Sequence, residues 1–415
     1  NFPSVALAYR ISEEAFLKNS SIISNLKIRA GYGVTGNQEI GNFQFLPRFT
    51  QGLPSASVQF GNGFVNTLRA DAFDPNLKWE ELRSFNIGVD FGLFGDRITG
   101  SIEYYNKTTT DLLFTVPVAA GANLSDRVLT NIGELESSGV EFALDATAVN
   151  TKSFRWNLSY NIAFNRNKLL KFTAFNDPSF IGILKGGIAG GVGNNVQILQ
   201  VGQPLNSFFL FKHKLDGNGN PLIDGVDHNG DGTIDMADMY EDISGPDGNP
   251  DGIVNDLDKR VVENPAPSVI MGLTSNMYYK DFDFSFTLRA NLGNYVYNNV
   301  RSNGAYFNRA ILDAAPSNMV RSVNETNFTA PQYFSDVYLE NASFMRLDNI
   351  SLGYRFDKLL KNKIKLRAFV TAQNVFVITD YKGLDPEIAN RNDDGIDNDI
   401  FPRARTVIFG VNIDF

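Results

Sequence analysis

The stretch that decides the fold is Arg405-Thr-Val-Ile-Phe-Gly-Val-Asn-Ile-Asp-Phe415 at the end of the chain. Every second residue from Val407 to Phe415 is apolar, so a β-strand of this sequence has one apolar and one mixed face. The pattern is typical of a transmembrane strand whose outer face contacts lipid, and it also fits the interior of a soluble β-sandwich.

The same alternation recurs along the chain and predicts thirteen strands. They are expected at Val5–Ile11, Leu26–Val34, Phe85–Phe91, Ile98–Asn106, Leu112–Val118, Gly139–Thr147, Phe154–Asn165, Ser207–Lys214, Val269–Met277, Phe282–Asn291, Phe344–Phe356, Ile364–Asn374 and Arg405–Phe415. Tight turns join several pairs, at 93–96, 150–153, 280–281 and 358–363, whereas other connections are long and polar. Short turns at one end and long loops at the other are typical of a transmembrane barrel.

Composition supports an all-β chain. Among 415 residues there are 34 Phe, 15 Tyr and 36 Gly but only 2 Trp, which suits many strands joined by turns. Mean hydropathy is −0.17, and no apolar run approaches the roughly 18 residues of a membrane helix. A helical membrane protein is therefore excluded.

Charge and the scarcity of reactive side chains exclude other classes. A net charge of −9 without a basic patch argues against nucleic acid. With no Cys and only two His, zinc sites and Ser-His-Asp catalysis are disfavoured, and no specific catalytic constellation is present. We therefore do not predict an enzyme. The chain begins at Asn1 in what reads as mid-protein sequence, so we expect a fragment of a longer protein.

Eight phrases in order resemble the SusC/RagA family, the TonB-dependent outer-membrane transporters of Bacteroidota. They are the stretches 26–38 (LKIRAGYGVTGNQ), 76–80 (NLKWE), 96–113 (DRITGSIEYYNKTTTDLL), 131–141 (NIGELESSGVE), 338–354 (YLENASFMRLDNISLGY), 373–376 (QNVF), 381–387 (YKGLDPE) and 401–405 (FPRAR). Each phrase is weak alone, but the ordered set covers nearly the whole chain.

The resemblance implies the C-terminal part of an antiparallel transmembrane β-barrel of about 22 strands, with the plug and TonB box outside this chain. It implies location in the outer membrane of a Gram-negative bacterium. It also implies a SusD-like lipoprotein partner, coupling to the TonB complex and contact with outer-membrane lipid. Phe415 resembles the terminal signal that the β-barrel assembly machinery reads.

An acidic loop within residues 216–260, expected to be extracellular, contains two calcium-loop patterns. The first places oxygen ligands at Asp227, Asn229, Asp231, Thr233, Asp235 and Asp238, and the second at Asp247, Asn249, Asp251, Ile253, Asn255 and Asp258. We expect structural Ca²⁺ here. The competing interpretation is a solvated turn, because Asp, Asn and Gly favour turns for backbone reasons.

Three functions remain open from the sequence. The first is TonB-dependent import of an oligosaccharide or peptide. The second is a receptor-like barrel that acts as a structural subunit of a larger outer-membrane complex without transporting. The third is a soluble calcium-binding β-protein that acts on or binds glycans at the cell surface.

Overall fold

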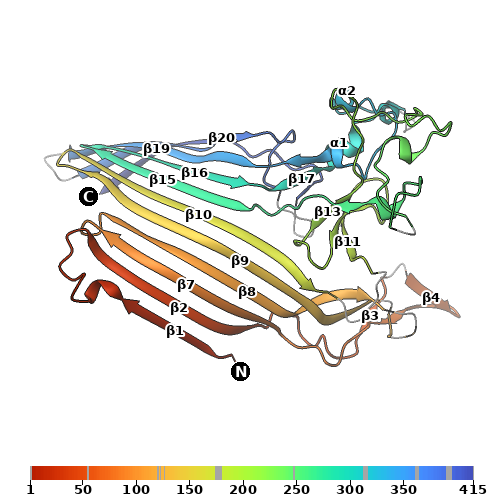
Figure 1. Cartoon of the computed structure of the whole chain (residues 1–415), viewed down its shortest axis with the longest axis horizontal. Helices are drawn as coiled ribbons and strands as arrows, with labels where there is room; N and C mark the ends of the chain where they lie inside the picture. Colours follow the sequence, from red (N-terminus) through yellow and green to blue (C-terminus); the bar gives the residue numbers. More distant parts are fainter. Residues whose placement is uncertain are drawn as a thin grey trace.

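The computed structural model describes residues 2–53, 56–118, 121, 123–125, 127–172, 180–245, 248–311, 316–359, 364–388 and 395–414. Within them the main element is an eleven-stranded antiparallel sheet whose strand order follows the chain (Figure 1). The strands are β1 (Ser4–Arg10), β2 (Ile23–Asn37), β7 (Glu80–Leu93), β8 (Ile98–Pro117), β9 (Arg127–Asn150), β10 (Phe154–Lys171), β15 (Val269–Tyr279), β16 (Phe282–Leu292), β19 (Phe344–Leu359), β20 (Ile364–Thr379) and β22 (Thr406–Asp414). Strands β1 and β22 form its two edges.

The pairing register collects the apolar side chains of all strands on one face. Val407 lies opposite Ala372 and Phe409 opposite Val370, so the alternation in β22 continues in β20. Phe409 is 81% exposed. An apolar face left uncovered by other elements is what lipid contact requires, because hydrocarbon gives apolar side chains a partner that water does not. The prediction for the terminal strand is confirmed.

The opposite face of the sheet carries paired charges. Arg29 on β2 donates from Nε to Asp90 Oδ1 on β7 at 3.1 Å and from Nη2 to Glu103 Oε2 on β8 at 2.6 Å. Arg367 on β20 similarly donates to both carboxylate oxygens of Asp283 on β16. Together with the apolar outer face, this polar inner face gives the alternation of apolar and polar residues that is typical of outer-membrane barrel strands.

Three of the thirteen predicted segments do not form separate strands of the large sheet. Ile98–Asn106 and Leu112–Val118 belong to one long strand, β8, because the register shifts at Asp111 without ending the pairing with β9. The segment predicted at Ser207–Lys214 contributes only a short strand outside the wall, since its side chains are buried on both faces and lack a membrane-facing side. The other predicted segments all lie in the large sheet.

At one end of the sheet the connections are short turns except for 11–22, which contains η1 (Ile11–Glu13), whereas the long connections lie at the other end (Figure 1). The short turns span 94–97, 151–153 and 280–281, as predicted, and the one at 360–363 lies outside the described residues. The long connections span 38–79, 172–268, 293–343 and 380–405. All extended loops therefore gather on one side of the expected membrane.

Most of the long connections fold into a compact body that we call the loop cap, defined as residues 180–268 and 293–343 as far as they are described, with 395–397. It holds two small sheets and several one-turn helices. The elements are β11 (Ile183–Gly187), β12 (Asn195–Leu199), β13 (Ser207–Leu210), β14 (Arg260–Val261), β17 (Tyr295–Asn298), β18 (Leu339–Asn341), β21 (Ile396–Asp397), α1 (Asn299–Gly304), α2 (Val323–Thr326), η3 (Met236–Asp238), η4 (Asp256–Asp258), η5 (Phe307–Ala310) and η6 (Asp336–Tyr338). Outside it lie η1 (Ile11–Glu13) and the hairpins β3 (Phe49–Gln51) with β6 (Leu68–Ala70) and β4 (Ser57–Phe60) with β5 (Gly63–Asn66).

The largest buried cluster lies in this cap and not in the sheet. Its members come from segments far apart in sequence: Ile188, Val196, Phe208, Leu210, Tyr297, Tyr306, Phe328, Tyr338 and Ile396. None of the helices in the described part of the chain has the length and apolar character needed to cross a membrane.

Candidate functional site

Several of the phrases that carry the family resemblance meet where loop 38–79 joins the wall. Asp111, at a positive φ of 59°, marks the bulge in β8. Its carbonyl accepts from Asn131 Nδ2 at 2.6 Å, and its carboxylate pairs with Lys78 Nζ at 2.7 Å. Glu80 accepts from the Leu113 amide at 3.0 Å. These residues fasten the loop to the strands and do not form a ligand site.

Four later phrases meet at a second junction, which we call the arginine cluster. It joins the inner wall to the segment 380–388 and to Arg403. Its members are Arg289, Arg346, Arg403, Asp348, Asp385 and Glu387. Three guanidinium groups therefore face three carboxylates, and the cluster is neutral overall.

Arg346 is the most buried cation of the cluster. Its side chain is 3% exposed and that of Asp385 is 4% exposed. Nη2 donates to Asp385 Oδ1 at 2.7 Å, Nη1 donates to Asn374 Oδ1 at 2.6 Å, and Nε lies 3.0 Å from Glu387 Oε2. A buried charge with this many partners is stabilised in place, whereas loss of one partner leaves an uncompensated charge.

Arg289 links the same loop to the neighbouring strand. Its guanidinium donates to both oxygens of Asp348 at 3.0 and 3.3 Å, and to Glu387 Oε1 and Oε2 at 2.5 and 3.0 Å. Burial alone would raise the pKa of Glu387, but the hydrogen bonds from Arg289 and the nearby charges of Arg403 and Arg346 outweigh it and lower that pKa below its ordinary value. Glu387 therefore stays ionised.

Beside the arginine cluster is a cavity of about 480 Å³ under the loop cap. We call it the inner cavity. It is lined by Asn167, Leu205, Asn206, Pro265, Ala266, Pro267, Asn291, Asn294, Val296, Phe344, Pro386, Glu387, Ile388, Gly395 and Arg403. Asn167 and Asn291 project from the inner faces of β10 and β16, so the cavity opens on the polar side of the wall.

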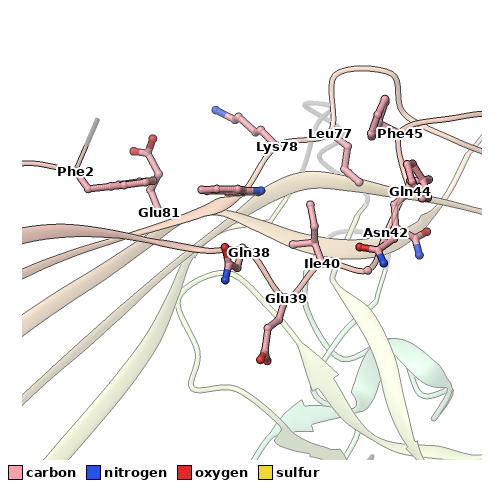
Figure 2. A pocket seen from close by; sticks show the side chains of 13 residues that line it. Phe2, Gln38, Glu39, Ile40, Asn42, Gln44, Phe45, Leu77, Lys78 and Glu81 are labelled. Atoms are coloured by element: carbon pink, nitrogen blue, oxygen red, sulfur yellow. The ribbon is translucent and has the colours of Figure 1, made fainter.

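A second hollow of about 900 Å³ lies between the start of β1 and the loop after β2. Figure 2 shows Phe2, Lys78 and Glu81 at one end and Gln44 and Phe45 at the other. The rings of Phe2 and Trp79 stack with centroids 6.1 Å apart. The sequence reasoning did not single out this hollow, although Trp79 is one of only two tryptophans in the chain.

The first predicted calcium loop folds as a tight turn around two of its carboxylates. Asp227 accepts from the amides of Gly230 and Gly232 at 2.6 and 3.0 Å. Asp238 accepts from the amides of Asn229 and Asp235 at 3.0 and 3.1 Å, and the hydrogen bond from Asn229 is the main reason that the pKa of Asp238 is lowered.

The remaining predicted ligands of this loop serve local turns. Asp231 Oδ1 accepts from the Thr233 amide at 2.7 Å, and Asp235 Oδ1 accepts from the Ala237 amide at 2.8 Å, where it caps η3. Within the described ranges, no three His, Cys, Asp or Glu side chains gather closely enough to hold a metal. Calcium binding by this loop stays a prediction.

The second loop has the same design with a different first residue. Asp258 accepts from the amides of Ile243 and Ser244 at 2.8 and 2.9 Å, as Asp238 does from His228 and Asn229. Asp242 accepts from the Gly252 amide at 2.6 Å.

Asp242 therefore occupies the place that Asp227 has in the first loop, and the sequence of the second loop has five extra residues, 246–250, between the two halves of the motif. The predicted Asp247 lies outside the described residues. Asn249, Asp251, Ile253 and Asn255 lie in the turn that leads to η4, where Asn255 caps the helix. Asp247 as a calcium ligand stays a prediction.

Phe208, Phe209 and Tyr306 are buried in the loop cap, and Phe208 and Tyr306 belong to its largest buried cluster. Phe415, the expected assembly signal, lies outside the described residues, and the described part of β22 ends at Asp414.

Comparison with known proteins agrees with this architecture. Residues 1–375 match the family model described as TonB dependent receptor-like, beta-barrel. The TonB-dependent receptor SusC of Bacteroides thetaiotaomicron is 40% identical over 427 residues, which cover 100% of this chain and 40% of SusC. TonB-dependent receptor P3 of Formosa agariphila is 31% identical, with 100% of this chain and 42% of that receptor covered.

Among solved structures, the RagAB peptide transporter superposes with a TM-score of 0.75 at 22% identity, covering 99% of this chain and 43% of the matched chain. This likeness shows a shared fold. The chain spans about two-fifths of the length of the curated relatives it matches. We conclude that it belongs to the TonB-dependent receptor-like β-barrel family of the bacterial outer membrane, as a SusC/RagA-type member.

Proposed function

We propose that the complete protein is a TonB-dependent importer that carries an oligosaccharide or a peptide across the outer membrane, and that it does no covalent chemistry. The observation that carries the proposal is the 40% identity to SusC along the whole chain. The wall supports it, because an apolar outer face and a polar inner face suit a barrel that encloses a hydrated path.

We propose two protein partners for this importer. A SusD-like lipoprotein would cover the side of the barrel where the loop cap lies, and the TonB complex would supply energy through a part of the protein outside this chain. Support for the lipoprotein comes from the arrangement of the long connections, which all lie at one end of the sheet (Figure 1).

Uptake by living cells tests the importer proposal. Wild-type cells, cells that lack this receptor and cells that lack TonB would be fed labelled oligosaccharides and peptides, and uptake would be measured with and without a protonophore. We expect uptake that needs the receptor, TonB and the proton gradient. Unchanged uptake in the receptor deletion, together with loss of an outer-membrane complex on native gels, would identify a structural subunit instead.

We also propose that the loop 227–238 binds Ca²⁺ as a structural ion of the cap. Support comes from the spacing of its Asp and Asn residues, from Gly232 at a φ of 90° in the sharp turn of the motif, and from the second copy of the design at 242–258. Side-chain and carbonyl oxygens would hold the ion and stiffen the loop.

A further inference from the structure

The apolar outer face of the wall ends at one row of side chains, near the end of the sheet that carries the long connections. In this row Phe164 on β10 lies opposite Val140 on β9, which lies opposite Tyr104 on β8. All three side chains are exposed. The next outer-face position on β10 is Arg166, because alternate residues of a strand share a face. The outer face therefore changes from apolar to charged within one step of the alternation.

The length of the apolar stretch places Arg166 at the surface of the membrane. On β10 every outer-face residue from Phe154 to Phe164 is aliphatic or aromatic. From residue 154 to residue 164 a strand rises about 34 Å, or about 26 Å along the membrane normal at a tilt of about 40°. Outer-membrane barrels have an apolar band about 25 Å tall and carry their long loops on the extracellular side. Arg166 is thus at the level of the lipid headgroups of the outer leaflet.

A hollow of about 460 Å³ lies on the outer face at this boundary. Its apolar lining comes from four neighbouring strands, through Tyr104, Val140, Phe164 and Val269. The hollow follows from a step in the wall, because β10 continues to Lys171 whereas β15 begins at Val269, opposite Phe164. A hollow in a lipid-facing surface can hold part of one particular lipid molecule, which a smooth surface cannot do.

The polar rim of the hollow carries a positive charge that is not balanced. Arg166 and Ser138 both line the hollow and lie opposite each other on β10 and β9, and Asn106 on β8 is next in the same row. Among the residues that the structure describes, none forms a hydrogen bond or an ion pair with the Arg166 guanidinium. The neighbouring outer-face cation, Lys168, differs because Glu136 lies opposite it.

The donors in this row suit a phosphate group. A guanidinium binds phosphate oxygens through parallel N–H groups, and a hydroxyl can donate to a further oxygen. Side chains that lie directly opposite on paired strands have Cβ atoms about 5 Å apart, so one phosphate can contact both Arg166 and Ser138. Inorganic phosphate would leave the apolar hollow below these donors empty. Phosphate and hollow together indicate a ligand that has hydrocarbon attached to an anionic headgroup.

We propose that this hollow binds one phosphorylated lipid of the outer leaflet, with the phosphate at Arg166 and Ser138 and hydrocarbon against Tyr104, Val140 and Phe164. In the outer membrane of a Gram-negative bacterium the lipid with these properties is lipopolysaccharide. The bound lipid would fill the step in the wall beside β10. Because the site is on the outside of the barrel, this inference does not depend on the proposed import.

Three variants of the full-length receptor test the site. Arg166→Gln removes the unbalanced charge and no contact within the described chain, so the receptor should assemble normally, which heat modifiability on SDS gels checks. Val140→Phe fills the hollow with another lipid-compatible side chain. Arg83→Gln is the matched control, because Arg83 is also on the outer face beyond the apolar band, on β7, but lies 3.7 Å from Glu81 and does not line the hollow.

Native mass spectrometry in mild detergent measures the binding. Delipidated receptors are titrated with lipopolysaccharide, with phosphatase-treated lipopolysaccharide and with inorganic phosphate. We expect wild type and Arg83→Gln to bind intact lipopolysaccharide equally and Arg166→Gln to bind it about tenfold more weakly. Val140→Phe should also bind it more weakly, and phosphatase treatment should weaken its binding to wild type. Inorganic phosphate should not displace the lipid.

Equal binding by Arg166→Gln and wild type would overturn the assignment. An equal loss in Arg83→Gln would do the same, since any cation near the membrane surface would then be as effective as Arg166. Undiminished binding by Val140→Phe would show that the hollow is not the site. Displacement of the lipid by inorganic phosphate would identify a site for the free anion and would refute the proposed lipid ligand.

Discussion

Replacement of Arg346 by Met should loosen the segment 380–388 far more than any surface change. The substitution keeps much of the side-chain volume but removes the hydrogen bonds to Asn374 and Asp385 and the contact with Glu387. Asp385 would remain buried with Arg403 as its nearest cation, at 3.3 Å. Breaking a buried ion pair by removing one partner costs about 3 to 5 kcal/mol, which corresponds to about a hundredfold to a few thousandfold in the local opening equilibrium.

Hydrogen exchange of the full-length receptor measures this opening. A suitable reporter is the amide of Glu387, which donates to Asp385 Oδ1 at 2.9 Å and should exchange faster by that factor as long as local opening governs exchange. Lys382→Met is the matched control, because the pair of Lys382 with Glu325 is 55% and 49% exposed and is worth at most about 1 kcal/mol.

A double variant, Arg346→Met with Asp385→Leu, should recover part of the resistance of segment 380–388 to proteolysis, since no buried charge is then left unpaired. Proteolysis is the readout here because the double variant removes the acceptor of the Glu387 amide. If Arg346→Met and Lys382→Met accelerated exchange equally, the burial of the arginine cluster would not be the source of its strength, and the reasoning would be refuted.

Three further predictions concern the wall and the loop cap. Phe409→Arg, on the outer face of β22, should reduce the yield of heat-modifiable folded barrel on SDS gels, because a charge on the lipid face costs about 2 to 4 kcal/mol near the bilayer midplane. Asn412→Arg, on the inner face of the same strand, should still fold. Equal yields of the two variants would contradict the assigned faces. Chelation with EGTA should speed protease cleavage of wild type at 227–238, and added Ca²⁺ should reverse the effect. The Asp231→Ala variant should be cleaved at the same rate with EGTA and with Ca²⁺. A cleavage rate of wild type that did not respond to EGTA would count against the calcium site. Burial lowers the pKa of His213 below its usual 6.5, so the unfolded state binds a proton that the folded state does not, and the loop cap should lose stability as pH falls below about 6.5. The protease resistance of the cap should therefore decrease over this pH range in wild type but not in His213→Gln. A decrease that persisted in His213→Gln would show that another group causes it.

The sheet was largely predictable from sequence because its residues obey one local rule. A period of two, with an apolar outer face, follows from lipid on one side and water on the other, and it holds from β1 to β22. The rule failed at Asp111, where a single residue at positive φ shifts the register without ending the strand. Local pattern cannot distinguish such a bulge from a turn.

The loop cap was not predictable, because its contacts are not local. Ser207–Lys214 has the alternation of a strand, yet one of the strands that it pairs with, β14, is distant in the chain, as in the pairing of Phe209 with Val261. The calcium-loop motif shows the same limit. The spacing did not predict that Asp242 would accept from the Gly252 amide as Asp227 accepts from the Gly232 amide, because five extra residues separate the two halves of the second loop.

The position of the largest buried cluster also constrains the order of assembly. Tyr297 pairs with Ile396, and His213 contacts Ser335 across 122 positions of the chain, so these partners meet only after the intervening strands stand side by side. Formation of contacts between such distant segments is slow unless something first shortens the search. Pairing of the wall strands brings these distant segments close together. A receptor with a missing or misregistered strand should therefore carry an incompletely folded loop cap that proteases cleave easily. The protease sensitivity of the cap thus depends on whether the barrel below it has assembled correctly.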